Sequence, residues 1–517
     1  MNSRVLRPAH LALLLAGLVA ASTIRFGTFA PWGTDQAGYI ESSRRWSAKE
    51  LVAPVPLNSW PLLSDRPYAA SPPAFRPGLL IATDVSVYPL GFPVLLAAAE
   101  STFGDLAPYL IAPLFAGLMV WCTYAIGARA GSEWAGLAAA FLIAMSPVTL
   151  GYSVMPMSDV PAAALWSLAW LLSFGRGLGA AVASGAVTAL AVMVRPHLAP
   201  LGMVPLFLLV CGSQFGFRIH NWRRGIVFCL AALPGPVLVA WSQALLYGSF
   251  DTPGYPGYEA FFRLAHVPRN LWLLPKHLAT VHTPLVFLGL TAVTILFRKT
   301  HDAPRLVVLS SLMLLGITFA LYLPYLPYDD VYFVRFTLPA LMALSVLNGI
   351  QIWRAAQWLG RRMKPIAALA VAPTAMMIWF QAPAIHYTYT VYTEQSRLIQ
   401  MGHYLRAVLP ANAVVFCALQ SGAVQHLTRA DILRFDLLEP GSLDSWIERL
   451  TSRGFAPVLV LDEERDQSLF RAHATRELSK YRWMPRAEFR STSPVHYMVP
   501  VRRDRLDTDP GIVDVLQ

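Results

Sequence analysis

The chain has 517 residues, of which 55% are hydrophobic and only 14% are charged. Soluble proteins carry about 25% charged residues, so this composition, with a mean hydropathy of +0.47, excludes an ordinary soluble protein. The formal net charge of +11 does not indicate nucleic-acid binding, because most Lys and Arg residues lie at the ends of apolar runs, where they set the orientation of membrane helices.

Apolar runs near the length that crosses a bilayer recur from the N-terminus to about residue 382. The first run resembles a signal peptide behind Arg4 and Arg7, but an uncleaved helix is favoured because Asp35 follows it so closely. The predicted fold class is an all-α polytopic membrane protein. About eleven transmembrane helices are expected, at 9–28, 106–127, 134–152, 160–175, 178–194, 197–213, 225–247, 278–297, 305–324, 333–353 and 365–382.

The run VYPLGFPVLLAAAESTFG, residues 87–104, is short and begins with Pro89 and Gly91. If it crossed the membrane, every later connection would change sides. We therefore interpret it as a re-entrant or interfacial helix. With the N-terminus inside, the short loops rich in Arg and Lys then face the cytoplasm, as the positive-inside rule requires. The loop at 248–277 is the exception, because it is basic and yet lies outside.

The acidic residues divide the chain into two parts. Residues 1–393 hold 14 of the 30 Asp and Glu side chains, whereas residues 394–517 hold the other 16. The tail therefore has an ordinary soluble composition. We predict a transmembrane domain at 1–385 and a soluble extracytoplasmic domain at 386–517.

The tail alternates between predicted helices and strands. Helices are expected at about 394–409 and 442–454, with shorter helices after the first and third strands. This alternation indicates a small α/β domain. The expected strands are AVVFCAL, DILRFD, PVLVLD, RAEFRS and VHYMVP.

The predicted orientation gathers acidic residues on one side of the membrane. Twelve of the 14 acids of the membrane part lie outside, mostly in a first outer loop (about 30–105) and a second large outer loop (about 248–277). A transporter would instead place polar groups near mid-membrane, in broken helices of two related halves, and we find no internal repeat. The sequence therefore predicts an outward-facing site that is covered by loops.

Such a site suits an enzyme that uses a lipid-linked sugar donor. A carboxylate takes the proton of an acceptor hydroxyl as the oxygen attacks the anomeric carbon, and Arg residues offset charge on the departing phosphate. Asp35, directly after the first span, suits the base role. Arg195 in MVRPHLAP and Arg335 in YFVRFTLPA lie at outer helix ends, where a lipid phosphate would lie. No P-loop motif is present, which argues against an ATP-driven pump, and no sizeable cytoplasmic domain is predicted, which argues against a nucleotide-sugar donor.

Five stretches, taken in their order along the chain, carry a resemblance to a known superfamily: WGTDQAGYI, YPLGFPVLLA, AMSPVTLGYSVMPMSDVPAAAL, VRPHLAPL and LYLPYLPYDDVYFVRFTLPALMAL. Through them the chain resembles the GT-C glycosyltransferases that use polyprenyl-phosphate sugars. Within that superfamily it resembles glycosyltransferase family 39, with the protein O-mannosyltransferases and lipid A aminoarabinose transferases. The resemblance implies that Asp35 is the catalytic base and that Asp159 assists it. The sequence departs from the family at Gln36, where members often have a second acid, which leaves metal use open.

Structural roles compete with these functional ones. Asp35 can cap the next helix, and Ser158 or Asp159 can cap a helix that begins near Pro161. Arg195 and Arg335 can be interfacial anchors that reach toward lipid headgroups.

Other residues complete the predicted site. Arg269, in the second outer loop, is a further candidate for binding the donor phosphate. Tyr39, Glu41, Asp84 and Tyr88, in the first loop, are candidates for contacting acceptor or donor. A divalent cation stays open as a cofactor, with His266, His277 and His282 as candidate ligands, although their spacing matches no ligand motif.

The sequence thus predicts a glycosyltransferase of the cytoplasmic (inner) membrane that moves a sugar from a polyprenyl-phosphate carrier, with inversion. The acceptor would be an extracytoplasmic lipid, glycan or protein hydroxyl, and the active site and C-terminal domain would face the periplasm. Membrane lipids are expected partners and nucleic acid is not. Two other classes stay open: a non-catalytic membrane subunit, and a transporter of lipid carriers or polysaccharides.

Overall fold

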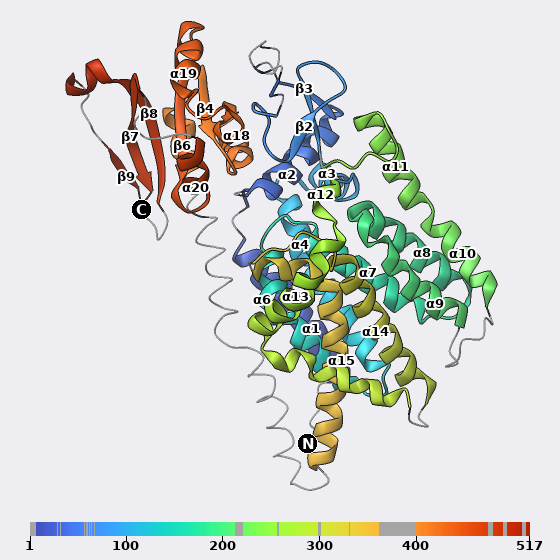
Figure 1. Cartoon of the computed structure of the whole chain (residues 1–517). Helices are drawn as coiled ribbons and strands as arrows, with labels where there is room; N and C mark the ends of the chain where they lie inside the picture. The colour runs from blue at the N-terminus through green and yellow to red at the C-terminus, as the bar shows by residue number, and fades with distance from the viewer. Residues whose placement is uncertain are drawn as a thin grey trace.

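A computed structural model gives the fold of this chain (Figure 1). It describes residues 7–516 except for a set of single positions and short segments and one long segment. Those exceptions are 28, 32, 56, 58–59, 61–62, 64, 67, 212–220, 256–257, 298–300, 330, 361–395, 397–398, 474–478, 490–493 and 509–512.

Within these residues, six helices are long and apolar enough to cross a membrane, or up to eight if each of two bent helix pairs is one span. The chain is therefore a multi-pass membrane protein. The six are α1 (Pro8–Arg25), α4 (Ala107–Ala128), α8 (Gly177–Val194), the pair α10 and α11 (Trp222–Ala232 and Pro234–Tyr247), α14 (Asp302–Tyr322), and α15 (Leu338–Gly360) with the residues that lead into it.

The two bent pairs show why the expected number of eleven spans is not confirmed. The span expected at 134–152 bends by 58° between α5 (Glu133–Ala144) and α6 (Pro147–Ser153). Ser146 caps α6 by accepting a hydrogen bond from Thr149 N, and Pro147 opens it, as at a new helix start.

The second bend, of 108°, separates the helical segment that ends with α13 (Val267–His282) from the 3-10 helix η5 (Pro284–Ile295). The span expected at 278–297 therefore straddles this bend. Thr283 lies at the break with a φ of 62°, in the left-handed region where a helix cannot continue.

Two other expected spans are short. α7 (Asp159–Ser173) has 15 residues, which extend about 23 Å at 1.5 Å per residue, less than the roughly 30 Å of a bilayer core. The span expected at 197–213 is a 3-10 helix, η3 (Pro196–Gly202), followed by α9 (Met203–Cys211). The last expected span, 365–382, lies outside the described residues.

The helix α15 lies at the centre of the bundle. The best apolar window of the segment Phe333–Gly360 is 89% buried, against 22% for α1. Small residues let neighbouring backbones approach it closely. A Cβ atom added at Gly349 would lie 2.4 Å from the backbone oxygen of Ala135 in α5, so that position has no room for a side chain.

The first loop folds over one end of the bundle (Figure 1). It contains α2 (Thr34–Ala48), a small antiparallel sheet of order β1-β3-β2, and α3 (Gly91–Phe103). The strands are β1 (Val52–Pro54), β2 (Phe75–Pro77) and β3 (Thr83–Ser86). α3 falls in the run at 87–104 that we interpreted as re-entrant or interfacial, and its 13 residues are too few to cross a bilayer core.

The C-terminal region is an α/β structure, as its alternating pattern predicts. Its mixed sheet has the order β5-β4-β6-β8-β7-β9, and the domain boundary predicted near residue 385 lies outside the described residues. Besides a helix at 399–408, the elements are β4 (Ala413–Cys417), α18 (Ser421–Thr428), β5 (Asp431–Arg434), α19 (Leu443–Ser452), β6 (Ala456–Asp462), α20 (Glu463–His473), β7 (Tyr481–Phe489), β8 (Val495–Arg502) and β9 (Asp514–Leu516).

The first loop and the C-terminal region pack against each other. Leu57 and Leu63 of the loop share a hydrophobic cluster with Phe416 of the sheet. Arg66 Nη2 lies 2.7 Å from Glu439 Oε1 in an ion pair, and α18 lies beside α2 (Figure 1). α2 is therefore held from both the membrane part and the C-terminal region.

The close contact between α15 and α5 can be tested by replacing Gly349 with Leu. We expect Gly349→Leu to lower the free energy of unfolding by about 1–3 kcal/mol, the usual loss on overpacking, because α15 would have to move away from α5. Thermal unfolding of the detergent-purified protein measures this. Gly316→Leu on α14 is the matched control, because a Cβ there meets nothing within 4 Å; equal losses in both variants would contradict the packing argument.

Candidate active site

The carboxylate of Asp35 lies in the first turn of α2, where the helix N-terminus favours negative charge. The Tyr88 hydroxyl donates a 2.9 Å hydrogen bond to Asp35 Oδ1. Arg335 Nη2 lies 3.5 Å from Oδ2. The Asp35 side chain is 34% exposed, so it is oriented by two partners and still accessible to a ligand.

Asp159 lies in the first turn of α7, and its side chain is fully buried. Arg195 Nη2 lies 2.7 Å from Asp159 Oδ1, although neither carboxylate oxygen accepts a well-aligned hydrogen bond from the described residues. The pair is thus an ionic contact whose carboxylate keeps unused acceptor positions. A buried carboxylate needs such a cation, because an isolated charge is strongly disfavoured away from water.

Ser158 joins this buried pair to α2. Its hydroxyl lies 2.8 Å from the Tyr39 hydroxyl and accepts a 3.0 Å hydrogen bond from Arg195 Nε. The Ser158 side chain makes no capping hydrogen bond to α7. Its role is therefore to connect Tyr39 to Arg195, and the capping role considered from the sequence does not apply to it.

Two guanidinium groups converge on one aromatic ring. The Cζ atoms of Arg195 and Arg335 lie 5.7 Å and 4.8 Å from the centroid of the Phe336 ring, within the range of a cation–π contact. Arg335 also lies over the ring of Tyr152, at 5.6 Å. The aromatic rings thus hold two cations close together, each paired with its own carboxylate.

The tyrosines pack between the two ion pairs. The rings of Tyr39 and Tyr88 stack with their centroids 4.0 Å apart, and Tyr255 meets Tyr88 edge-on at 6.1 Å. Burial, and then the nearby Asp35 carboxylate, raise the pKa of Tyr88 well above its ordinary value. The Tyr88 hydroxyl therefore keeps its proton and acts as the donor to Asp35.

Gly38 allows this stacking. A Cβ atom at position 38 would lie 2.2 Å from the Cβ of Ala74 and 2.5 Å from a ring carbon of Tyr88. Only glycine lets α2 lie so close to the Tyr88 ring. The sequence did not indicate Gly38, Tyr255 or Phe336 as site residues and gave Ser158 only a capping role, although Ser158 and Phe336 directly adjoin the predicted Asp159 and Arg335.

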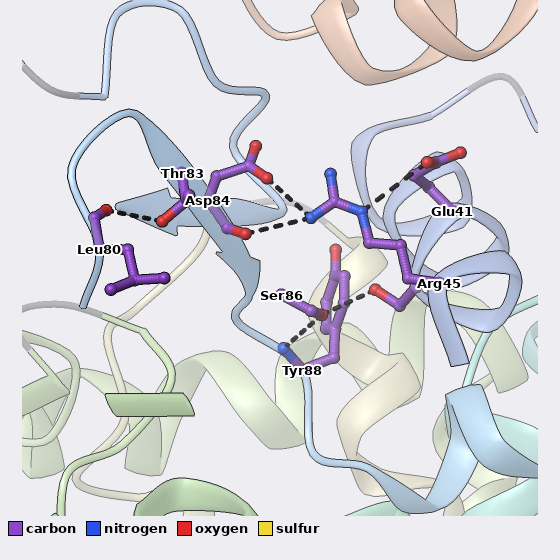
Figure 2. A network of polar contacts seen from close by, with 8 residues as sticks. Glu41, Arg45, Leu80, Thr83, Asp84, Ser86 and Tyr88 are labelled. Carbon is purple, nitrogen blue, oxygen red and sulfur yellow. Dashed lines mark hydrogen bonds and ion pairs between the residues drawn. The ribbon is translucent and has the colours of Figure 1, made fainter. Parts of the chain in front are cut away.

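Asp84 and Glu41 hold the first loop together through Arg45 (Figure 2). Arg45 Nη1 lies 2.7 Å from Asp84 Oδ1 and donates to the Asp84 backbone oxygen at 3.3 Å, while Glu41 Oε1 lies 3.7 Å from Arg45 Nε. Arg45 also covers the Phe75 ring, at 4.1 Å. These contacts fix β3 against α2.

The end of β3 leads from this ion pair to Tyr88. Ser42 on α2 donates a 2.7 Å hydrogen bond to the Ser86 hydroxyl, which accepts a 3.2 Å hydrogen bond from Tyr88 N (Figure 2). The described contacts thus bring Asp35, Tyr39 and Tyr88 together with the Arg195–Asp159 pair and Arg335. They place Asp84 and Glu41 at the side of this cluster, around Arg45.

The remaining candidates have partners other than these residues. Arg269 forms an ion pair with exposed Asp329, and within the described residues it forms no ion pair with Asp35. His266, His277 and His282 each contact a different partner: the backbone oxygen of Pro324, that of Tyr328, and the hydroxyl of Ser146. Among the side chains that the structure describes, no three potential metal ligands are grouped.

The comparisons identify the fold. No family model matches the sequence, and no curated protein matches it. Solved structures of GT-C membrane glycosyltransferases do match, so the chain has the GT-C fold that the resemblance implied.

One match is ArnT from Cupriavidus metallidurans bound to undecaprenyl phosphate, with a TM-score of 0.56 and 12% identity over 95% of this chain and 97% of that one. Another is the apo oligosaccharyltransferase of Archaeoglobus fulgidus, with a TM-score of 0.52 and 11% identity over 94% of this chain and 74% of that one. The oligosaccharyltransferase AglB from Archaeoglobus fulgidus, in complex with an inhibitory peptide and a dolichol-phosphate, matches over the same shares with a TM-score of 0.53 and 10% identity.

The buried Arg45–Asp84 pair makes a pH-dependent prediction. Burial already raises the pKa of Asp84 despite the cation beside it. In Arg45→Met the pKa rises further, so the folded state binds a proton more tightly than the unfolded state. We expect a loss of about 3–5 kcal/mol at neutral pH, the usual effect of leaving one buried charge unpaired, and this loss shrinks as the pH falls below the raised pKa of the folded state.

Thermal unfolding of wild type and Arg45→Met across a pH series measures this difference. Glu41→Gln is the control, because Glu41 is 26% exposed and its contact with Arg45 is longer, at 3.7 Å. A loss in Arg45→Met that does not change with pH, or is no larger than in Glu41→Gln, would contradict a buried pair.

Proposed function

We propose that the protein is a glycosyltransferase that moves a sugar from a polyprenyl-phosphate carrier to an acceptor hydroxyl. The observation that carries the proposal is the Asp35 carboxylate, one-third exposed and oriented by Tyr88, beside the cation of Arg335. The proposed base and the proposed phosphate-binding group thus lie side by side. The GT-C fold supports it, because matched proteins of that fold were solved with undecaprenyl phosphate and dolichol-phosphate.

The proposed reaction is a single displacement. The acceptor oxygen attacks the anomeric carbon while its proton passes to an oxygen of Asp35. The bond between the anomeric carbon and the phosphate oxygen breaks with its electron pair on that oxygen, so the carrier leaves as polyprenyl phosphate and the anomeric centre inverts. The guanidinium groups of Arg335 and Arg195 offset the charge that develops on the phosphate.

Asp159 has a different proposed role from Asp35. Its side chain is fully buried and lies against Arg195, so it is less accessible to an acceptor than Asp35. We assign it the positioning of Arg195, together with Ser158, which accepts a hydrogen bond from the same guanidinium. This is the assisting role that the resemblance implied for it.

The proposed cellular setting follows the predicted orientation. The active site, the first loop and the C-terminal region would face the periplasm, with a membrane domain at 1–385 and a soluble domain at 386–517. The acceptor would then be an extracytoplasmic lipid, glycan or protein hydroxyl. Incubating the purified protein with several polyprenyl-phosphate sugars and identifying the consumed lipid by mass spectrometry would establish the donor.

Replacing the proposed base gives the main test. Asp35→Asn keeps the size of the side chain but cannot take the proton, so we expect kcat to fall by about 10²–10⁴-fold while the donor still binds. Sugar transfer and donor binding in purified protein measure the two effects separately. Asp105→Asn is the control, because Asp105 is exposed at the start of α4. Full transfer by Asp35→Asn would instead favour a non-catalytic subunit or a transporter.

Replacing Arg335 tests the phosphate contact. We expect Arg335→Gln to lower kcat/KM by at least about tenfold, the loss expected for a charge-assisted hydrogen bond. Arg335→Lys should recover part of it, because it restores the charge without the planar fork. Steady-state kinetics with the identified donor give these values. Arg25→Gln, at the exposed end of α1, is the control; an unchanged kcat/KM in Arg335→Gln would remove Arg335 from donor binding.

A further inference from the structure

A second basic site lies between α2 and the C-terminal region. A cavity of about 120 Å³ is lined by Arg44, His403, Arg406, His426, Leu427 and Arg429. One ordered water needs only about 10–15 Å³ on the same measure, so the cavity has room for a polyatomic group. We call it the basic pocket.

Three separate elements build the basic pocket. Gly422 of α18 lies against Ala37 of α2, where a Cβ would be 3.3 Å from the Ala37 Cβ. Arg44 follows Ala37 by seven residues, about two turns, and so lies on the same face of α2. The helix at 399–408 packs on the other end of α18, because a Cβ at Gly402 would lie 2.4 Å from the Leu427 side chain.

The pocket gathers cations without a neutralising carboxylate. Throughout the described parts of the chain, no Asp or Glu forms an ion pair with Arg44, Arg406 or Arg429, whereas other arginines of these two regions, such as Arg66 and Arg434, do have such partners. The like charges repel each other across the contact between α2 and the C-terminal region, so a bound anion would reduce this electrostatic repulsion.

The surroundings of His426 show how close these cations lie. Its Nδ1 atom is 3.3 Å from Arg44 Nη1. Burial, followed by the charges of Arg44, Arg429 and Arg406, lowers the pKa of His426 to about 3. The imidazole is therefore neutral and supplies a polar contact, while the three guanidinium groups supply the charge.

We propose that the basic pocket binds a phosphate group. Planar guanidinium forks match phosphate oxygens and bind them with charge-assisted hydrogen bonds, and three of them around one cavity favour a dianion over a singly charged ion. The phosphate can belong to a water-borne molecule or to a lipid headgroup, which share this chemistry.

The basic pocket is separate from the proposed reaction centre. Arg44 and Asp35 are nine residues apart on α2, which places them on opposite faces of the helix and about 14 Å apart along its axis. The phosphate bound here is therefore not the one beside Asp35. Binding here does not depend on sugar transfer, and Asp35→Asn should leave it unchanged.

Thermal unfolding of the full chain in phosphatidylcholine nanodiscs tests the proposal. Inorganic phosphate and pyrophosphate should raise the melting temperature above that in chloride of equal ionic strength, because a ligand that binds only the folded state stabilises it. In Arg406→Gln/Arg429→Gln the apparent phosphate affinity should be at least about tenfold weaker. Arg471→Gln/Arg482→Gln, which removes two exposed arginines of the same region, is the charge-matched control and should behave like wild type.

Lipid composition separates the two sources of phosphate. If a headgroup fills the pocket, adding phosphatidylglycerol to the nanodiscs will stabilise wild type but not Arg406→Gln/Arg429→Gln, and will reduce the effect of added phosphate. If the pocket takes only water-borne phosphate, the lipid will make no difference between the variants. The proposal is overturned if phosphate does not stabilise wild type, or stabilises the double variant equally. Both readouts are independent of transfer activity, so a failure here is distinguishable from a failure of the proposed reaction.

Discussion

The pairing of buried charges constrains the whole active-site region. Asp159 is fully buried and Asp35 is one-third exposed, and each lies beside an arginine because an unpaired carboxylate there would be strongly destabilising. The difference in exposure is the basis of the different roles proposed for them. The inner pair is enclosed, whereas the outer pair leaves carboxylate oxygen accessible.

Breaks in the helices provide these four charges. Asp35 and Asp159 begin helices, Arg195 follows the end of α8, and Arg335 lies in the 3-10 helix η6 (Val331–Thr337) before α15. A regular helix satisfies its own backbone groups in the membrane, while a helix end leaves some of them free and brings polar side chains with it. Two of these breaks also shorten apolar segments, because Asp159 begins the short helix α7 and the apolar segment after Arg195 ends at Cys211.

Much of the fold follows from local sequence patterns. The long apolar helices, five of the six strands of the C-terminal sheet, and the candidate site residues Asp35, Arg195 and Arg335 come from hydropathy, alternation and charged residues at helix ends. The contacts of Ser158 and the close fit of Gly38 against Tyr88 do not, because they join residues at least 37 positions apart in the sequence. The bend at Thr283 could not be predicted from the sequence either. Its φ is positive, and threonine has no special preference for turns.

α2 is the element on which these features meet. One face carries Asp35, Gly38 and Tyr39 toward Tyr88, the opposite face carries Ala37 and Arg44 toward α18, and Arg45 lies between them against β3. A helix of 15 residues is rigid over this length, so a shift of α18 that moves Arg44 also moves Asp35 at the other end. The position of the proposed base is therefore set by the contact with the C-terminal region as well as by the membrane helices.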